Sequence, residues 1–237
     1  MLGESRREPV TYAHAPLTRD ELAALKALST PTVANAVEVF DVQPRNTGFM
    51  DPSIRAVVLA DAPLVGYAVT AKIRARDPRD PAVTATRRQM WEHILSVPEP
   101  RVVVIEDLDE QPIGSFWGEV QANIHRALGC IGAVTNGGVR DLDEVRALGF
   151  NLFAGSVMVS HAYVHVVEVG TPVTLGGLSV RPGDLLHGDQ HGVAAIPLAI
   201  ARQLPEGARR VEERERKIIA LCQSPDFSID RLSELYG

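Results

Sequence analysis

Residues 101–154 read RVVVIEDLDEQPIGSFWGEVQANIHRALGCIGAVTNGGVRDLDEVRALGFNLFA, and this stretch decides the fold. Three apolar runs in it are typical of buried strands: residues 101–106, 131–135 and 151–154. They alternate with segments at 118–128 and 142–148 that have helical periodicity. A β-α-β-α-β order makes neighbouring parallel strands joined by helical crossovers. We therefore expect a parallel sheet in the middle of the chain.

The flanking segments predict a mixed α/β architecture around that sheet. Before it, the patterns indicate three helices and two short strands: helices at 19–28, from about 29, and at 82–95, and strands at 56–60 and 66–73. After residue 155, short apolar runs separated by Gly and Pro turns predict a mostly antiparallel β-layer. A final helix at about 206–222 precedes a polar tail. The expected fold class is an α/β layered sandwich with a mixed sheet and a C-terminal helix.

Length and composition limit the possible classes of protein. With 237 residues, of which 45% are hydrophobic, the chain can bury one sizeable core. We expect a single domain over residues 1–237, with an extended N-terminal arm at 1–17 and a C-terminal helix and tail at 206–237. No apolar run approaches the roughly 18 residues that cross a membrane, and the N-terminus lacks the apolar stretch of a secretory signal. Cys130 and Cys222 have no C-x-x-C spacing, so we expect reduced thiols and a cytoplasmic protein.

Charge disfavours nucleic acid as a partner. The formal net charge is −6, whereas proteins that bind nucleic acid concentrate Lys and Arg on one surface. The stretch at 209–217 is rich in Arg but also in Glu, which is typical of an exposed helix face. We therefore expect a small-molecule partner, with no nucleic acid and no membrane.

Two turn–helix junctions contain the residues best suited to catalysis. Glu119 stands at the start of one expected helix, and Arg140-Asp141 stand just before the next. Twenty residues separate Glu119 from Arg140, about the length that one helix, turn and strand consume. The chain therefore returns to the same edge of the sheet, and two carboxylates and a guanidinium can converge there.

This set of residues suits a divalent cation and an anionic ligand. Mg²⁺ and Mn²⁺ prefer carboxylate and water oxygens, and Mg²⁺ often takes only one or two protein carboxylates. Arg140 can bind a carboxylate through two parallel hydrogen bonds. The exposed amides at the start of the helix, in residues 118–121, add an anion site.

Each of these residues also has a structural alternative. Asp is a favoured helix N-cap, and Asp141 precedes Glu144 at capping-box spacing, so spacing alone favours the cap. Arg140 can form a surface ion pair with Asp143 or Glu144. Residues 137–138 are Gly-Gly and can form a turn, and no G-x-G-x-x-G sequence indicates a nucleotide loop.

The histidines give weaker signals. His161 and His165 are four residues apart, as in zinc-binding helices, but their surroundings resemble a strand and favour solvated or core-edge side chains. His187 and His191 flank Asp189 in a Gly-rich loop, where stabilising the loop is favoured over a place in a site. A G-x-S-x-G nucleophile elbow is absent from the sequence.

The chain resembles the ribonuclease E activity regulator A-like superfamily, which includes the 4-hydroxy-4-methyl-2-oxoglutarate/4-carboxy-4-hydroxy-2-oxoadipate aldolases. Five segments carry the resemblance: STPTVANA at 29–36, VGYAVT at 65–70, GEV at 118–120, GGVRD at 137–141 and GGLSVRPGD at 176–184. In the aldolase branch the signature is an acidic residue, a twenty-residue interval and Arg-Asp. Glu119, Arg140 and Asp141 match it in order.

The resemblance implies a role for each residue. Asp141 would coordinate Mg²⁺ or Mn²⁺, Glu119 would hold water ligands of the metal, and Arg140 would bind the 2-oxo acid end of the substrate. Amides of four residues would complete the pocket: Gly118, Glu119, Val120 and Gln121. The implied fold is a swivelling β/β/α sandwich.

The implied assembly is a trimer or hexamer with active sites between subunits. A neighbour's C-terminal helix would contribute an acid, for which Glu212, Glu213 and Glu215 are candidates. One departure is Gln190-His191, where the family more often has a second acidic residue. This departure leaves the substrate open.

The function expected from the resemblance and from these residues is a metal-dependent retro-aldol cleavage of a 4-hydroxy-2-oxo acid to pyruvate and an oxo acid, with possible oxaloacetate decarboxylation. The sequence has no Lys between Lys72 and Lys217, which disfavours a Schiff-base aldolase. Two alternatives stay open. One is a non-catalytic regulator that binds a protein such as a ribonuclease, and the other is a related lyase or isomerase acting on a sugar acid.

Overall fold

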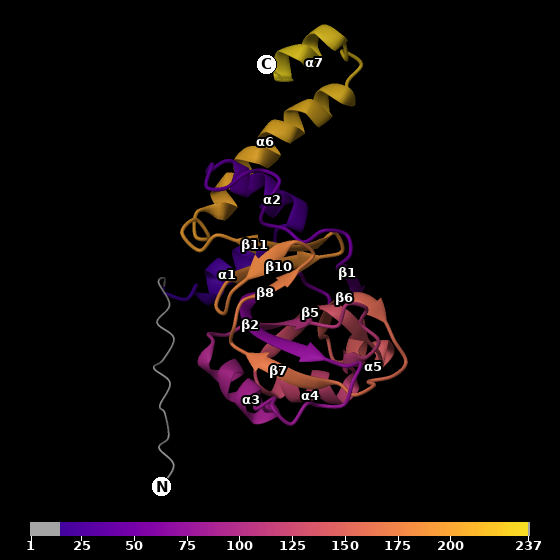
Figure 1. The fold of residues 1–237 in the computed structure, drawn as a ribbon. Coiled ribbons are helices and arrows are strands. Elements are labelled where there is room, and N and C mark those ends of the chain that lie inside the picture. The colour runs from indigo at the N-terminus through magenta and orange to yellow at the C-terminus, as the bar shows by residue number, and fades with distance from the viewer. Residues whose placement is uncertain (1–14, 237) are drawn as a thin grey trace.

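A computed structural model of the protein describes residues 15–236, and the expected α/β layered sandwich is confirmed (Figure 1). A nine-stranded mixed sheet has helices on one face and a small β-hairpin on the other. Most of the arm predicted at 1–17 falls outside the described residues. At the end of that arm, the amide of Leu17 donates to the Tyr67 hydroxyl at 2.7 Å. In the described part of the chain, no helix combines the length and apolarity needed to cross a membrane.

The centre of the sheet is parallel, as residues 101–154 predicted. Four neighbouring parallel strands form it: β6 (Asn151–Val157), β5 (Cys130–Val139), β3 (Arg101–Asp107) and β2 (Leu64–Arg74). Three helices lie on the connections between them: α3 (Arg87–Ser96), α4 (Glu119–Ala127) and α5 (Leu142–Ala147). The sheet and these crossovers bring the C-terminal end of β5 and the first residues of α4 and α5 together.

The strands are continuously apolar because both faces of the sheet are covered. In β3, Val103 and Ile105 pack in the cluster that includes residues of the helices. Val102 and Val104 pack on the opposite face, in the cluster that includes the hairpin. All four side chains are fully buried. Because side chains alternate along a strand, β3 contributes to two cores, one on each face of the sheet. Each core is stabilised by the removal of apolar area from water.

Antiparallel strands complete the sheet, in agreement with the pattern after residue 155. The antiparallel strands are β1 (Arg55–Val58), β7 (His165–Val169), β10 (Leu185–Asp189) and β11 (Gly192–Ile196). β10 and β7 both pair with β2, one with each half of that long strand. The separate hairpin is formed by β8 (Val173–Leu175) and β9 (Leu178–Val180).

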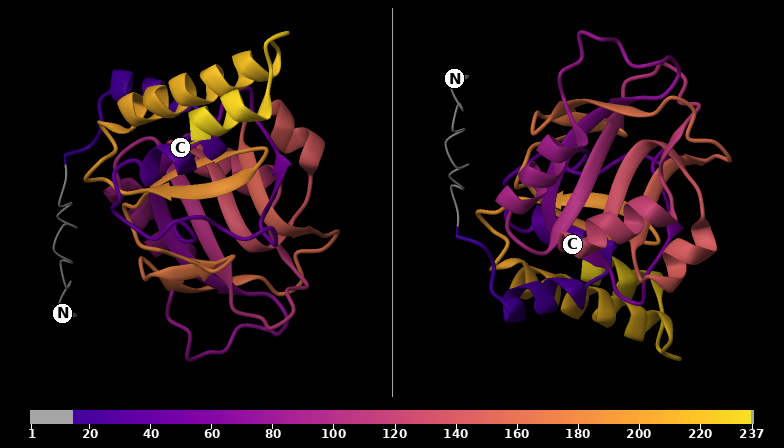
Figure 2. Two further views of the ribbon diagram at one scale, coloured as in Figure 1. Left: turned by 90° about the horizontal axis from the view of Figure 1, so that it is seen from above. Right: turned by 90° about the horizontal axis from the view of Figure 1, so that it is seen from below.

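Four further helices pack beside β10 and β11 or extend away from the sheet. They are α1 (Arg19–Lys26), α2 (Thr30–Glu38), α6 (Leu204–Cys222) and α7 (Ile229–Tyr236). The first part of α6 packs on α2, and the rest projects from the body with α7 (Figures 1 and 2). The sequence predicted only a polar tail after residue 222, and this prediction was wrong. Although α7 is strongly amphipathic, none of its residues is buried.

Three local predictions are also corrected. α3 begins at Arg87 rather than 82, because Thr86 is its N-cap and forms a capping box with Gln89. Gly137-Gly138 is not a turn but part of β5, which continues to Val139. The short strand β4 (Ser115–Trp117), which pairs in parallel with the end of β5, was missed because a three-residue run has no readable periodicity.

Candidate active site

A cavity of about 520 Å³ opens where β4 and β5 end and α4 and α5 begin. The register of the two strands explains its position. Trp117 pairs with Val139, and because the strands run parallel, the residues that follow them, Gly118 and Arg140, lie side by side. The Arg140 amide donates to the Trp117 carbonyl at 3.1 Å and fixes this arrangement.

Asp141 joins the two helices at the cavity. It is at the N-cap position of α5, but its side chain makes no capping hydrogen bond there, so the predicted cap with Glu144 was wrong. Its Oδ2 instead accepts the amide of Glu119 at 3.0 Å, at the start of α4. Its backbone is left-handed, with φ 54° and ψ 47°. Such a conformation costs a non-glycine residue about 1–2 kcal/mol, less for Asp, and strain of this kind clusters at functional sites.

Gly118 makes room for that carboxylate. A Cβ at this position would lie 2.5 Å from Asp141 Oδ2 and 3.2 Å from Arg140 Cγ. The backbone of Gly118 is extended, with φ −169°, a conformation open to any residue. The glycine is therefore needed for close approach rather than for its backbone freedom.

Arg140 faces the same cavity. Its Nε lies 3.8 Å from Asp141 Oδ2, and 37% of its side chain is exposed. The alternative of a surface pair with Asp143 or Glu144 was wrong, because Asp143 pairs with Arg146 at 2.6 Å and Arg140 pairs with Asp141. The guanidinium therefore remains available to an anion in the cavity.

The first turn of α4 contributes differently from what the resemblance implied. The Glu119 amide is occupied by Asp141, while the Glu119 side chain is at the exposed rim and does not itself line the cavity. Val120 and Gln121 do line it, and first-turn amides such as theirs have no partner within a helix. Of the four residues that the resemblance implied, Glu119 is therefore the one whose amide is already occupied.

The sequence did not identify several other residues of the cavity. They are Arg79, Arg87, His161 and His165. Ala162, between the histidines, also has a left-handed backbone, with φ 46°. For the two arginines the available signal was the density of Arg in residues 74–88, and nothing in its spacing pointed to the site.

His161 and His165 share the cavity without forming a zinc site. The Nδ1 of His161 is 2.6 Å from the Ala162 carbonyl, and that of His165 is 2.8 Å from the Tyr163 carbonyl. Across residues 15–236, no group of three or more His, Cys, Asp or Glu side chains is arranged to hold a metal. His165 begins β7 and His161 precedes it, so the two histidines are not on one helix face as the zinc alternative required; both form part of the cavity wall.

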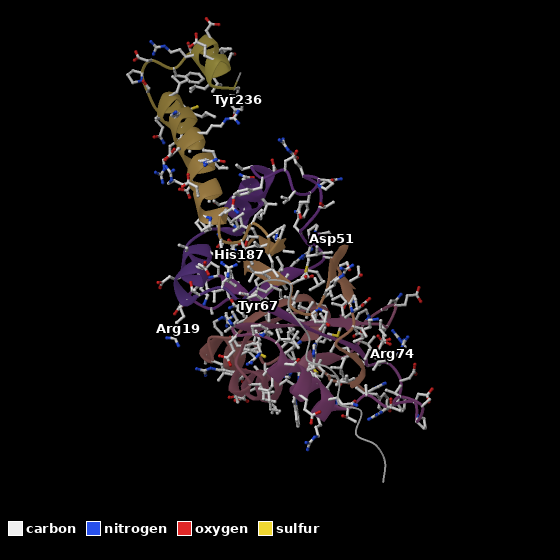
Figure 3. The ribbon with its side chains drawn as sticks, turned by 90° about the vertical axis from the view of Figure 1, so that its left-hand side faces the viewer. Arg19, Asp51, Tyr67, Arg74, His187 and Tyr236 are labelled. Atoms are coloured by element: carbon white, nitrogen blue, oxygen red, sulfur yellow. The ribbon has the colours of Figure 1, made fainter. Side chains whose placement is uncertain are left out.

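His187 and His191 do not line this cavity. His187 lies on β10 against the N-terminal helices α1 and α2 (Figure 3). His187 is fully buried, with Nδ1 2.9 Å from Thr30 Oγ1 and Nε2 3.2 Å from the Leu25 carbonyl. Burial lowers its pKa, so it is held neutral. His191 pairs with Asp189 at 3.0 Å. Both positions agree with the structural role that the sequence favoured.

The three C-terminal glutamates are on α6, far from α4 (Figure 1). Glu212 pairs with Arg216 and Glu213 with Arg209, while Glu215 accepts from Asn35 at 3.3 Å. None of them lines the cavity of its own chain.

The residues at the cavity fit a hard divalent cation. Asp141 Oδ1 has no protein partner in the described structure, and the missing Cβ of Gly118 leaves space beside the carboxylate. The Glu119 carboxylate, also without a partner in the part of the chain described, begins the adjacent helix. Proteins usually bind Mg²⁺ through one or two carboxylates, and water molecules complete its coordination.

A buried carboxyl at the end of β3 gives a testable pH dependence. Asp107 ends β3 with 3% exposure, and its Oδ2 has no partner among the described residues. Burial raises the pKa of Asp107 to about 6. In the unfolded chain this carboxyl ionises near pH 3.9. The contribution of Asp107 to the free energy of unfolding is therefore most favourable at low pH. It falls as pH rises from about 4 to 6, and it stays unfavourable at pH 7.

We expect Asp107→Asn to raise the free energy of unfolding at pH 7.5 by up to about 3 kcal/mol, the equivalent of a pKa shift of about two units. Urea denaturation from pH 4 to 8 measures it, with Asp77→Asn in an exposed loop as the control. If the free energies of unfolding of wild type and Asp107→Asn differed by the same amount at every pH in this range, the raised pKa of Asp107 would be contradicted.

Comparison with known proteins finds relatives of similar sequence and solved structures of similar fold. The chain is similar to a protein of Halalkalibacterium halodurans that is provisionally named a 4-hydroxy-4-methyl-2-oxoglutarate aldolase. The two are 29% identical over 124 residues, and the match covers 50% of this chain and 59% of that protein. The matched part spans about half the length of such curated relatives.

Two solved structures share the fold over most of the chain. An uncharacterized protein from Pseudomonas syringae pv. tomato has a TM-score of 0.72 and 25% identity, over 97% of this chain and 99% of that one. Streptomyces coelicolor RraAS2, described as an unusual member of the RNase ES inhibitor RraA family, has a TM-score of 0.67 and 19% identity, over 86% and 97%. The RraA-like family model, described as Aldolase/RraA, matches residues 30–195, more than two thirds of the sequence. On this match, the chain belongs to the RraA-like family.

Proposed function

We propose that the protein is a divalent-metal-dependent lyase that cleaves a 4-hydroxy-2-oxo acid to pyruvate and a second oxo acid, and that also decarboxylates oxaloacetate. The observation that carries the proposal is the junction of Asp141, Arg140 and Gly118 at one cavity. Asp141, whose backbone is strained, places there a carboxylate that suits a metal. The Arg140 guanidinium lies beside it, and Gly118 leaves space for both. The name of the Halalkalibacterium halodurans relative supports the same reaction.

The roles of the residues follow from the chemistry of the reaction. Cleavage breaks the C3–C4 bond: a base takes the proton of the C4 hydroxyl, and the electron pair moves to the C2 carbonyl to give the enolate of pyruvate. Mg²⁺ or Mn²⁺, held by Asp141 and Glu119, would supply a Lewis acid for that carbonyl. Arg140 binds the carboxylate of the 2-oxo acid and orients it. Glu119, at the rim, takes the hydroxyl proton through a water and returns it to C3.

The assembly proposed for this reaction is a homotrimer or homohexamer in the cytoplasm. The glutamates at 212, 213 and 215 do not line the cavity of their own chain, and the helices α6 and α7 project from the body (Figure 3, where Tyr236 marks the end of α7). A second copy is therefore what would bring one of these acids to the site.

We expect pyruvate release from 4-hydroxy-4-methyl-2-oxoglutarate and from oxaloacetate in the presence of Mg²⁺ or Mn²⁺, with turnover on the order of 10 s⁻¹. Coupling to lactate dehydrogenase measures pyruvate, and a reaction without protein corrects for spontaneous decarboxylation. Chelation should stop release, and added metal should restore it.

Other outcomes point to the alternatives. A folded protein that binds metal but releases no pyruvate from either substrate would act on another oxo acid or on a sugar acid. A protein that neither binds metal nor releases pyruvate would contradict the lyase and favour a regulator that binds a protein partner.

A further inference from the structure

Decarboxylation of oxaloacetate needs a proton that retro-aldol cleavage does not need. In the cleavage proposed above, Glu119 takes a proton from the C4 hydroxyl and returns it to C3, so no other donor is required. Oxaloacetate has no C4 hydroxyl. Its C3–C4 bond breaks to release CO₂, the electron pair moves to the C2 carbonyl, and C3 of the pyruvate enolate must take a proton from another group. Decarboxylation therefore requires an acid at the cavity that already holds a proton.

His161 has one ring nitrogen bound by the protein and one free. It lines the cavity, and its Nδ1 donates to the Ala162 carbonyl at 2.6 Å. Because a carbonyl oxygen only accepts, Nδ1 keeps its hydrogen in the neutral ring. Nε2 has no hydrogen-bond partner in residues 15–236, and it is the nitrogen at which the ring gains and loses its second proton. Imidazole changes charge between pH 5 and 8, which suits a proton donor near neutrality.

The turn that contains His161 is held against β4, the strand that ends at the candidate active site. The Ser115 amide donates to the Ser160 carbonyl at 2.9 Å. Gly114 permits this approach, because a Cβ there would lie 2.8 Å from the His161 carbonyl oxygen. Gly118 directly follows the same strand. One short strand thus ties His161 to the site.

The same turn is strained and firmly held. Ala162 has a left-handed backbone with φ 46°, which residues with a Cβ rarely adopt. Its amide donates to Ser160 Oγ at 3.0 Å. The next amide, that of Tyr163, donates to the Ala75 carbonyl at 2.9 Å. Strain of this kind persists only where the surroundings enforce it, and it clusters at functional sites. The turn therefore holds the imidazole at the cavity before a substrate binds.

Two other residues of the turn line the cavity but suit the role less well. The Nδ1 of His165 donates to the Tyr163 carbonyl at 2.8 Å, so its ring has the same tautomer. His165, however, begins β7 and pairs with Arg74 of β2, away from β4. Tyr163 offers a phenol, which is a much weaker acid than imidazolium. His161 is therefore the better donor.

We propose that His161, as the imidazolium, donates its Nε2 proton to C3 of the pyruvate enolate that remains after oxaloacetate loses CO₂. The neutral ring then takes a proton from solvent, so decarboxylation consumes one proton per turnover and retro-aldol cleavage consumes none. This inference rests on the proposed function for the placement of the oxo acid at Asp141 and Arg140. It assigns His161 to one of the two reactions and not to the other.

Two unreactive analogues test the contact by binding alone. Oxalate places an oxygen, and oxamate an amide NH₂ group, where the enolate has C3. The imidazolium can donate to the oxygen but not to the NH₂ group. Isothermal titration calorimetry in Mg²⁺ should show that His161→Asn weakens oxalate binding roughly tenfold, the loss of one charge-assisted hydrogen bond, and oxamate binding by less than about twofold. Asn removes Nε2 but keeps a donor for the Ala162 carbonyl.

Turnover gives the second readout. His161→Asn should lower kcat for oxaloacetate about 100-fold, because an enolate that is not protonated stays in the cavity and blocks the next turnover. Pyruvate release from 4-hydroxy-4-methyl-2-oxoglutarate should stay within about threefold of wild type, since its proton comes from the substrate. His191→Asn is the control, because His191 is exposed and does not line the cavity, and it should change neither reaction. Melting temperatures establish that the variants are folded.

Three results would overturn the inference: an unchanged oxalate affinity in His161→Asn, an equal loss of both reactions in that variant, or a loss in His165→Asn as large as in His161→Asn. The proposed function fails separately. A wild type that releases no pyruvate rejects the lyase and the acid role with it. A wild type that releases pyruvate from both substrates, with a His161→Asn variant that decarboxylates equally fast, rejects only the acid role.

Discussion

Asp141→Asn should lower kcat/KM for pyruvate release by about 1,000-fold or more, because a metal held by this carboxylate supplies several kcal/mol and each 1.4 kcal/mol is a factor of ten. The folded structure should survive. Asn retains an oxygen that can accept the Glu119 amide, as Asp141 Oδ2 does at 3.0 Å, and it tolerates the left-handed backbone at this position. What the variant loses is the negative charge that a hard dication requires.

Steady-state kinetics, metal titration and thermal melting together measure this effect. Asp143→Asn is the matched control, because Asp143 lies two residues further on, is 93% exposed and pairs only with Arg146. It should leave kcat/KM within about twofold of wild type, as is usual for exposed ion pairs. Full metal-dependent turnover in Asp141→Asn would remove Asp141 from the mechanism.

Gly118→Ala should lower kcat about 100-fold, because an ångström of misplacement at a reacting centre costs about that much. The new Cβ would lie 2.5 Å from Asp141 Oδ2, so the carboxylate must move away from its place beside Arg140. The extended backbone at this position suits Ala, and we therefore expect a folded protein with a modest loss of stability, about 1–2 kcal/mol.

A double-mutant cycle separates the clash from any general effect of the substitution. In an Asp141→Ala background the atom that the new Cβ would meet most closely is gone, so Gly118→Ala should cost much less unfolding free energy than in wild type. Urea denaturation of the four proteins measures the coupling. Equal costs in the two backgrounds would show that the clash with Asp141 is not what Gly118 avoids.

Much of the fold was predictable because its signals are local. The apolar runs of β3, β5 and β6 are long and alternate with helical periodicity, and a parallel order with crossovers follows from that pattern. The errors occurred where the local signal is short or ambiguous. β4 has three residues, Gly137-Gly138 resembles a turn but is extended, and α7 has no buried residue in the part of the chain that is described.

The candidate site shows the same division. The sequence identified the positions of Glu119, Arg140 and Asp141 at two junctions, but local spacing assigned Asp141 to the wrong helix as a cap. The correct hydrogen bond runs to a residue 22 positions earlier. It forms because β4 pairs with β5 and brings Gly118 beside Arg140, a contact that no helical or strand periodicity encodes.

The sequence by itself determined the parallel centre of the sheet, the two junctions and the family signature, because these depend on residues close together in the chain. Only the tertiary structure decided that Arg87 and the His161–His165 wall enter the same cavity as Arg140. It also decided that the carboxylate of Asp141 caps α4. The physical reason is that these contacts join segments remote in sequence, and their distances are set by the packing of strands and helices rather than by any pattern within one segment.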